Sequence, residues 1–254
     1  MSHSDPIRQN YYDAVQTTEK VADVLFIAGA LLSFGTLLID QKKYENIYDI
    51  VLLVFSLVVF ALFTLGILQR LYLTPRAEDK RRQDFFSSAC NVSLIHQQTD
   101  GYYNNDFKDP IKRMAAQVLE NSLFTKEITL KMARNERAKA AIYLLLWLIL
   151  LHFRRADLGW IVAASQAIFS EQTLSKWLRL EWLRIRAEKT FEDVFKLFQT
   201  RPPAIQFNAH ALDALTMYES TKATAAITLS SKIFDELNPV LSADWDKIKA
   251  TLKI

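Results

Sequence analysis

The pattern of hydrophobic and polar positions is dominated by two apolar runs near the N-terminus, at 24–39 and 50–68. Neither run contains a charged residue. Asp23 and Asp40 flank the first run, and Asp49 and Gln69 flank the second. A helix needs about 20 apolar residues to cross the hydrocarbon core of a bilayer, and the second run has that length. The first run is slightly shorter and becomes adequate with its flanks. The pattern therefore predicts a transmembrane hairpin at 21–69, preceded by a polar lead-in helix at 1–20.

Two shorter apolar runs lie in the middle of the chain, at 140–153 and 158–169. Each is short for a membrane span, and runs of this length also occur as buried core helices. Basic residues precede and follow the pair, which favours a second hairpin at 138–170 with both outer ends in the cytoplasm. Arg154 and Arg155 at its tip oppose this placement. Core helices of a soluble domain are the alternative interpretation.

The segments at 70–137 and 171–254 are charged and have apolar residues at helical spacing, which predicts a helical domain. Lys and Arg follow the first hairpin at once, so we expect this domain and the N-terminus in the cytoplasm. Pro239 is predicted to end a long helix, and Ser242 to begin the last one. The helices expected outside the hairpins are at 77–94, 111–137, 170–199 and 205–237.

Composition agrees with a helical chain. Among 254 residues there are 5 Gly and 6 Pro, and strict alternation of polar and apolar residues is hard to find. The single cysteine excludes an intrachain disulfide, and the net charge of +3 does not predict direct DNA binding. We therefore expect an all-α membrane protein with two N-terminal transmembrane helices, a second short hairpin and a helical cytoplasmic domain. The polar N-terminus lacks a cleavage signal, so the first span is expected to stay as an anchor.

The sequence carries no recognisable catalytic or cofactor motif. Gly-rich phosphate loops, the His-Glu-x-x-His pattern and the Gly-x-Ser-x-Gly pattern are missing, and the four histidines lie far apart. We therefore expect no enzyme, no metal site and no bound cofactor.

A basic stretch and a polar loop contain the residues best suited to an anionic ligand. Arginine forks match phosphate oxygens, and paired tyrosines with an asparagine can stack on a base and read its edge. A solvated face near lipid headgroups, with loop tyrosines packed on helices, is the alternative. The candidate ligand residues are Arg81, Arg82, Tyr102, Tyr103 and Asn104.

Small and polar residues within the apolar runs are candidates for helix packing or for lining a pore. Such residues let membrane helices approach closely and form hydrogen bonds across helices. The candidates are Gly29, Ser33, Ser56, Thr64 and Gln166.

Three short stretches, together with the hairpins, give the chain a family resemblance. They are 77–85 (AEDKRRQDF), 101–105 (GYYNN) and 120–124 (ENSLF). With them, most of residues 20–200 resembles the four-transmembrane effectors associated with SMODS nucleotidyltransferases in bacterial anti-phage operons. The two-transmembrane effectors linked to SMODS, SLOG or retron systems are the second choice, and fit better if 140–169 is not in the membrane.

The resemblance implies a homo-oligomeric effector of the bacterial inner membrane. Such effectors rearrange on a signal, often a cyclic nucleotide or oligonucleotide, and breach the membrane, which causes abortive infection. Expected partners are the lipid bilayer, further copies of the chain and a protein from the neighbouring defence operon. A membrane scaffold that recruits a soluble partner through aromatic C-terminal helices, and an ion channel of ordinary physiology, are the competing hypotheses.

Overall fold

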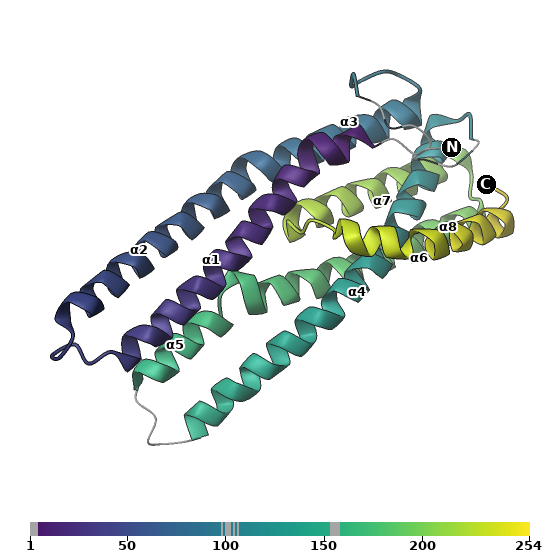
Figure 1. The fold of residues 1–254 in the computed structure, drawn as a ribbon. Helices are drawn as coiled ribbons and strands as arrows, with labels where there is room; N and C mark the ends of the chain where they lie inside the picture. The colour runs from purple at the N-terminus through teal and green to yellow at the C-terminus, as the bar shows by residue number, and fades with distance from the viewer. Residues whose placement is uncertain (1–4, 98, 100–102, 104, 106, 153–157) are drawn as a thin grey trace. The chain divides into compact units, whose positions relative to one another are not determined.

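The computed structural model describes residues 5–97, 99, 103, 105, 107–152 and 158–254 (Figure 1). Every regular element in this described part is helical, which confirms the all-α class for it. The elements are η1 (Arg8–Tyr12), α1 (Asp13–Leu38), α2 (Glu45–Leu68), η2 (Gln69–Leu73), α3 (Thr74–Cys90), α4 (Pro110–His152), α5 (Leu158–Ile168), η3 (Glu171–Ser175), α6 (Lys176–Thr200), α7 (Ala204–Ala225) and α8 (Ser231–Leu252).

The chain divides into two compact units. Unit 1 contains Met1–Tyr12, Pro75–Arg134 and Arg179–Ile254, and unit 2 contains Asp13–Thr74 and Asn135–Leu178. Unit 1 therefore contains the segments rich in charged residues, whereas unit 2 contains all four apolar runs.

In unit 2, α1 and α2 form an antiparallel pair, and α5 lies against α1 (Figure 1). The buried Gly29 of α1 faces α2, where a Cβ atom on this glycine would lie 3.4 Å from Val58 Cγ1. The ring of Phe34 lies 5.7 Å from that of Trp160 in α5. The absence of a side chain at position 29 therefore lets the two helices of the hairpin approach closely.

The second half of α4 pairs with α5 in the same unit. The indole Nε1 of Trp147 donates a hydrogen bond to Ser165 Oγ at 2.8 Å, and its ring meets Phe169 edge to face with centroids 5.4 Å apart. A polar contact and an aromatic contact thus join these two helices.

Unit 1 has a hydrophobic core to which all five of its long helical segments contribute. Phe85 of α3, Leu119 of α4, Val194 of α6, Leu215 of α7 and Trp245 of α8 all belong to it. A contiguous core of this kind is the usual basis of a stable helical domain.

The aromatic stripe of α6 also belongs largely to this core. Phe198 is buried between the rings of Phe107 and Phe207, and Phe191 and Phe195 pack against the core. Most of the aromatic surface that motivated the scaffold hypothesis is thus used inside the molecule.

The helix boundary predicted between residues 137 and 140 is absent. α4 runs without a break through residues 138–139, where the segment contains neither Gly nor Pro and Lys139 pairs with Glu136 one turn earlier at 3.0 Å. Nothing in that stretch interrupts the helical hydrogen bonds, although its polarity changes.

The predicted C-terminal break at Pro239 was wrong. α7 ends at Ala225 because Ala226 adopts a left-handed conformation (φ 47°) and donates its N–H to Lys222 O. Ser230 then starts α8 by accepting a hydrogen bond from the N–H of Ile233. Pro239 lies inside α8 on its exposed side. A left-handed helix end and an N-cap serine therefore set the boundary, and Ser242 does not cap a helix.

Candidate functional site

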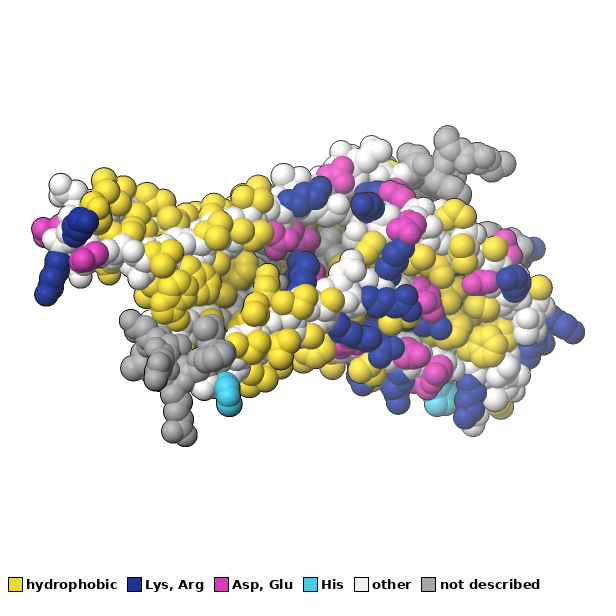
Figure 2. Space-filling model, turned by 60° about the horizontal axis from the view of Figure 1, so that its bottom comes forward, with side chains coloured by type: hydrophobic (Ala, Val, Ile, Leu, Met, Phe, Trp, Pro, Cys, Tyr) yellow, Lys and Arg dark blue, Asp and Glu magenta, His cyan; other side chains and the backbone are white. Residues whose placement is uncertain are grey.

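The most extensive functional feature is the exposed apolar surface of unit 2. Arg8–Leu38 and Glu45–Cys90 are two continuous helices long and apolar enough to cross a membrane, and none of the most apolar part of the second is buried. Phe60 and Phe63 expose 67% and 65% of their surface. Figure 2 shows hydrophobic side chains covering this hairpin up to the charged loop at its tip. Apolar surfaces of this extent normally contact lipid or another protein.

The second pair of apolar helical segments is also exposed, although it is shorter. Leu145 of α4 is 59% exposed and Val162 of α5 is 54% exposed. α5 has 11 residues, about half of what a full span needs. Spanning by 138–170 therefore stays a prediction.

The small and polar residues predicted to pack helices or line a pore differ in their exposure. Gly29 is buried against α2, Ser33 is partly buried, and Ser56, Thr64 and Gln166 are exposed. The hydroxyls of Ser56 and Thr64 donate to the carbonyls of Leu52 and Phe60, at 2.8 and 2.9 Å. Because these hydroxyls are satisfied within α2, the helix can expose them without leaving an unpaired donor. Pore lining and helix packing by these residues stay predictions.

The predicted ligand residues make contacts inside unit 1. Arg81 Nη2 donates to Asp5 Oδ2 at 2.7 Å, and its guanidinium lies over the ring of Tyr12. Arg82 pairs with Asp79 on its own helix at 2.5 Å and is half exposed. α3 thus directs its two neighbouring arginines toward separate partners.

The loop residues of the predicted ligand set are described only in part. Tyr103 packs edge-on against Phe85, with ring centroids 5.8 Å apart, at the margin of the core. Tyr102 and Asn104 lie outside the described residues. Binding of a ligand by these five residues stays a prediction.

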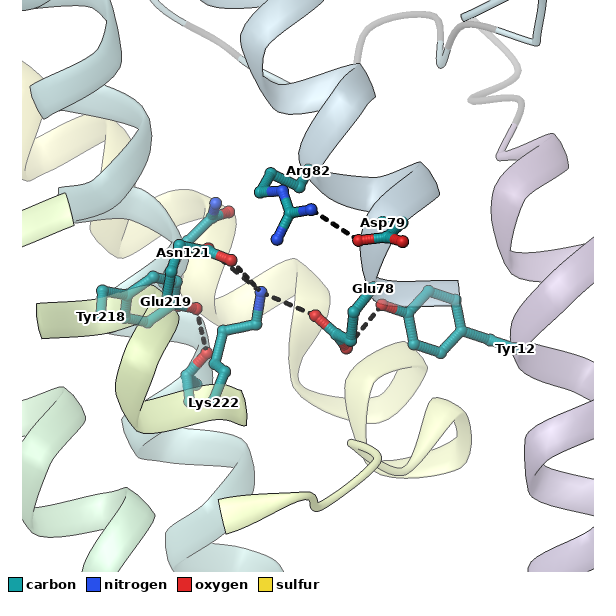
Figure 3. Close-up of polar contacts among 9 residues, drawn as sticks. Tyr12, Glu78, Asp79, Arg82, Asn121, Tyr218, Glu219 and Lys222 are labelled. Atoms are coloured by element: carbon teal, nitrogen blue, oxygen red, sulfur yellow. Dashed lines mark hydrogen bonds and ion pairs between the residues drawn. The ribbon is translucent and has the colours of Figure 1, made fainter. Parts of the chain in front are cut away.

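A polar cluster that the sequence did not single out connects three segments of unit 1 (Figure 3). The carboxylate of Glu78 on α3 accepts a hydrogen bond from Tyr12 Oη at 2.7 Å and pairs with Lys222 Nζ of α7 at 3.0 Å. Lys222 also contacts Glu219 at 3.2 Å. Glu78 and Lys222 keep 30% and 22% of their side-chain surface exposed. The cluster is therefore sheltered but not sealed from water.

The same cluster continues toward α4 through Tyr218 and Thr125. Lys222 lies 5.4 Å from the ring centre of Tyr218. The phenol oxygen of Tyr218 is 2.7 Å from Thr125 Oγ1 and donates to the carbonyl of Asn121 at 3.3 Å. Figure 3 shows Lys222 directed toward Glu78 and Glu219, with the Arg82–Asp79 pair beside them. Polar contacts therefore connect η1, α3, α4 and α7.

Three groups of this cluster, Tyr12, Glu78 and Lys222, have shifted pKa values. Burial acts to lower the pKa of Lys222, but the charges of Glu78 and Glu219 outweigh it, so this pKa lies well above its ordinary value. Burial acts to raise the pKa of Glu78, whereas Lys222 and the phenol of Tyr12 bring it below its ordinary value. Burial, followed by the charge of Glu78, raises the pKa of Tyr12. At neutral pH Glu78 is therefore a carboxylate, Lys222 an ammonium group and Tyr12 a neutral phenol.

No local sequence pattern predicts this cluster. Glu78 lies within the stretch 77–85 that carries the family resemblance, but that stretch does not reveal its partner. Lys222 stands in an ordinary helical context, and only the packing of α7 against α3 brings it to Glu78. Within the residues that the structure describes, no group of three or more His, Cys, Asp or Glu is arranged to hold a metal ion.

Comparison with protein-family models, with curated proteins and with solved structures gave no match for this chain. The resemblance to the four-transmembrane effectors therefore stays a prediction.

Proposed function

We propose that this chain is a membrane effector of bacterial anti-phage defence. It resides in the inner membrane as a homo-oligomer, rearranges on a nucleotide-type signal and permeabilises the membrane, which causes abortive infection. The observation that carries the proposal is the uncovered apolar surface of unit 2, where side chains such as Phe60 and Phe63 expose about two thirds of their area. Burial of such surface in lipid or against other copies is favourable by about 25 cal/mol per Å².

Permeabilisation needs a polar path through an otherwise apolar assembly. In this proposal Ser56 and Thr64, exposed on α2, and Gln166, exposed on α5, line that path when copies of the hairpin assemble. In the resting state the two hydroxyls remain bonded to carbonyls of their own helix, so contact with lipid costs little. In this proposal the same residues therefore contact lipid in the closed state and line the polar path in the open state.

Unit 1 is the regulatory part in this proposal. A ligand can drive a rearrangement only by binding one state more tightly than the other. The proposed contacts for that ligand remain Arg81, Arg82, Tyr102, Tyr103 and Asn104. Arg81 is paired with Asp5 at 2.7 Å, so an anionic ligand on its guanidinium competes with a carboxylate of the chain itself.

Reconstitution of the full-length protein into phosphatidylethanolamine–phosphatidylglycerol vesicles loaded with a self-quenched dye tests the proposal. We expect dye release that rises more steeply than linearly with protein density, because the path forms between copies. A Leu side chain at position 29 forces α1 from α2, and overpacking of this kind costs about 1–3 kcal/mol. We therefore expect Gly29→Leu to reduce dye release.

Gly35→Leu is the matched control, because a Cβ atom at position 35 meets no atom within 4 Å in the chain. It adds the same side chain to the same helix and is expected to retain most of the dye release. Vesicles that stay sealed at every protein density, with and without added cyclic dinucleotides and trinucleotides, would contradict permeabilisation.

A further inference from the structure

The first described residues form a short segment with its own helix start. Asp5 Oδ1 accepts a hydrogen bond from the N–H of Arg8 at 2.9 Å, and Pro6 takes the first helical position, where its missing N–H costs nothing. Ile7 is fully buried. We call residues 5–12 the N-terminal segment. It belongs to unit 1 and continues without a helical break into α1 of unit 2.

Polar contacts hold this segment on two helices of unit 1. The second carboxylate oxygen of Asp5 accepts from Arg81 of α3 at 2.7 Å, and both side chains are largely sheltered from solvent. Arg8 forms two hydrogen bonds with Asp235 of α8, at 3.0 and 2.9 Å. The hydrogen bond of Tyr12 to Glu78 fixes the other end of the segment.

The character of these contacts suits a reversible attachment. Ile7 is the segment's one fully buried apolar side chain, whereas Arg8 and Asp235 remain 34% and 57% exposed. Exposed ion pairs contribute little free energy, and salt screens them. Ile7 is therefore the buried apolar contact of the segment, whereas the exposed Arg8–Asp235 contact can exchange for water or for another charged group.

We propose that the N-terminal segment is an autoinhibitory latch. Held on α3 and α8, it restrains the start of α1, and its release frees α1 to take up the permeabilising arrangement. The latch rests on the proposed function, because it specifies how the apolar hairpin is kept inactive.

Charge exchange at the Arg8–Asp235 pair tests the latch in the full-length protein in the same vesicles. Arg8→Asp and Asp235→Arg each place like charges at the contact, so each should speed dye release and amide hydrogen exchange at residues 7–12. We expect about fivefold for each rate, the change that loss of one exposed ion pair can produce. The double variant Arg8→Asp/Asp235→Arg restores opposite charges and should return both rates toward those of the wild type.

Two further variants test whether the effect arises from the contacts of the N-terminal segment. Asp5→Asn weakens the sheltered contact with Arg81 without placing like charges together, and should speed both rates. Lys247→Asp makes the same charge change as Arg8→Asp at an exposed α8 residue whose partner is Asp244, and should leave both rates unchanged.

The two readouts separate the latch from the proposed function. Faster exchange of the segment with unchanged dye release overturns the latch. Equal effects of Lys247→Asp and Arg8→Asp, or no recovery in the double variant, overturn it as well. Density-dependent dye release by the wild-type protein supports the proposed function in either case. If neither the wild type nor any released variant permeabilises the vesicles, the proposed function falls and the latch falls with it.

Discussion

At the scale of single residues, Glu78 and Lys222 form a sheltered polar pair between two helices of unit 1. Their 3.0 Å contact joins α3 to α7, and the phenol of Tyr12 adds a second hydrogen bond to the same carboxylate. Because both side chains are mostly sheltered, the pair keeps more of its attraction than an exposed surface pair does.

Replacement of Glu78 by Gln removes one charge and leaves Lys222 with Glu219 alone. We expect unfolding of the protein in detergent to become easier by about 1–2 kcal/mol. Asp79→Asn makes the same chemical change one residue later, at an exposed pair, and should cost less than about 0.5 kcal/mol. Thermal unfolding followed by tryptophan fluorescence measures both, and equal effects would argue against a special role for the cluster.

The pKa shifts give this contribution a defined pH range. The pKa of Glu78 is lowered, so its stabilisation is present above the ordinary glutamate value of about 4.3 and is lost as pH falls through the lower folded value. The pKa of Lys222 is raised, so its share is present below about 10.4 and is lost as pH rises through the higher folded value.

The difference in melting temperature between the wild type and Glu78→Gln should therefore stay constant from about pH 5 to pH 9 and shrink in more acidic solution. Melting curves across this range provide the measurement. A difference that persists undiminished at the lowest pH the fold survives would show that the charge of Glu78 is not its cause.

Sequence reasoning found the residues that carry local patterns and missed those that depend on distant packing. Gly29 was proposed for helix packing because it is small, and a Cβ atom at this position would lie 3.4 Å from Val58 of α2; its role in packing stays a prediction. The pairing of Glu78 with Lys222, in contrast, arises only when α7 packs on α3, and no spacing rule within one segment encodes it.

At the scale of elements, the apolar runs predicted where helices lie, whereas Pro239 did not mark the end of a helix. The helix predicted at 77–94 is confirmed as far as Cys90, and it continues the helix that begins at Glu45. The polar sequence after the apolar run still favours a helix. The junction of α7 and α8 was misplaced because a non-glycine residue, Ala226, takes the left-handed conformation that ends α7. Glycine is the usual signal for such an end, and here it is missing.

Ala226→Gly should stabilise this junction, since glycine adopts a positive φ without the strain that a Cβ atom brings. We expect a gain of about 0.4–1 kcal/mol in the free energy of unfolding. Ala225→Gly, at the buried last residue of α7, should instead destabilise by about 0.5–1 kcal/mol. Chemical denaturation of both variants measures this, and a loss of stability in Ala226→Gly would contradict the assigned helix end.

At the scale of the whole molecule, the account places two apolar hairpins in the membrane and a charged helical domain in the cytoplasm. The division into two units follows the distribution of charge along the sequence, because unit 2 contains the apolar runs. The orientation across the membrane rests on the basic residues that follow the first hairpin.

Cys90, the single and exposed cysteine, reports this orientation directly. A membrane-impermeant maleimide should label it in spheroplasts only after the inner membrane is opened. In a Cys90→Ser background, Lys42→Cys, in the loop between α1 and α2, should be labelled in intact spheroplasts. The reverse labelling pattern would invert the topology, and labelling of both positions without opening would argue against a spanning hairpin.

The central claim is that the chain breaches the inner membrane during infection. The most direct test follows membrane potential with a voltage-sensitive dye in bacteria that express the full-length chain with its genomic neighbours during phage infection. The account predicts depolarisation before the phage burst, and weaker depolarisation with Gly29→Leu at equal expression. A potential that stays intact while the same system arrests the infection would contradict it.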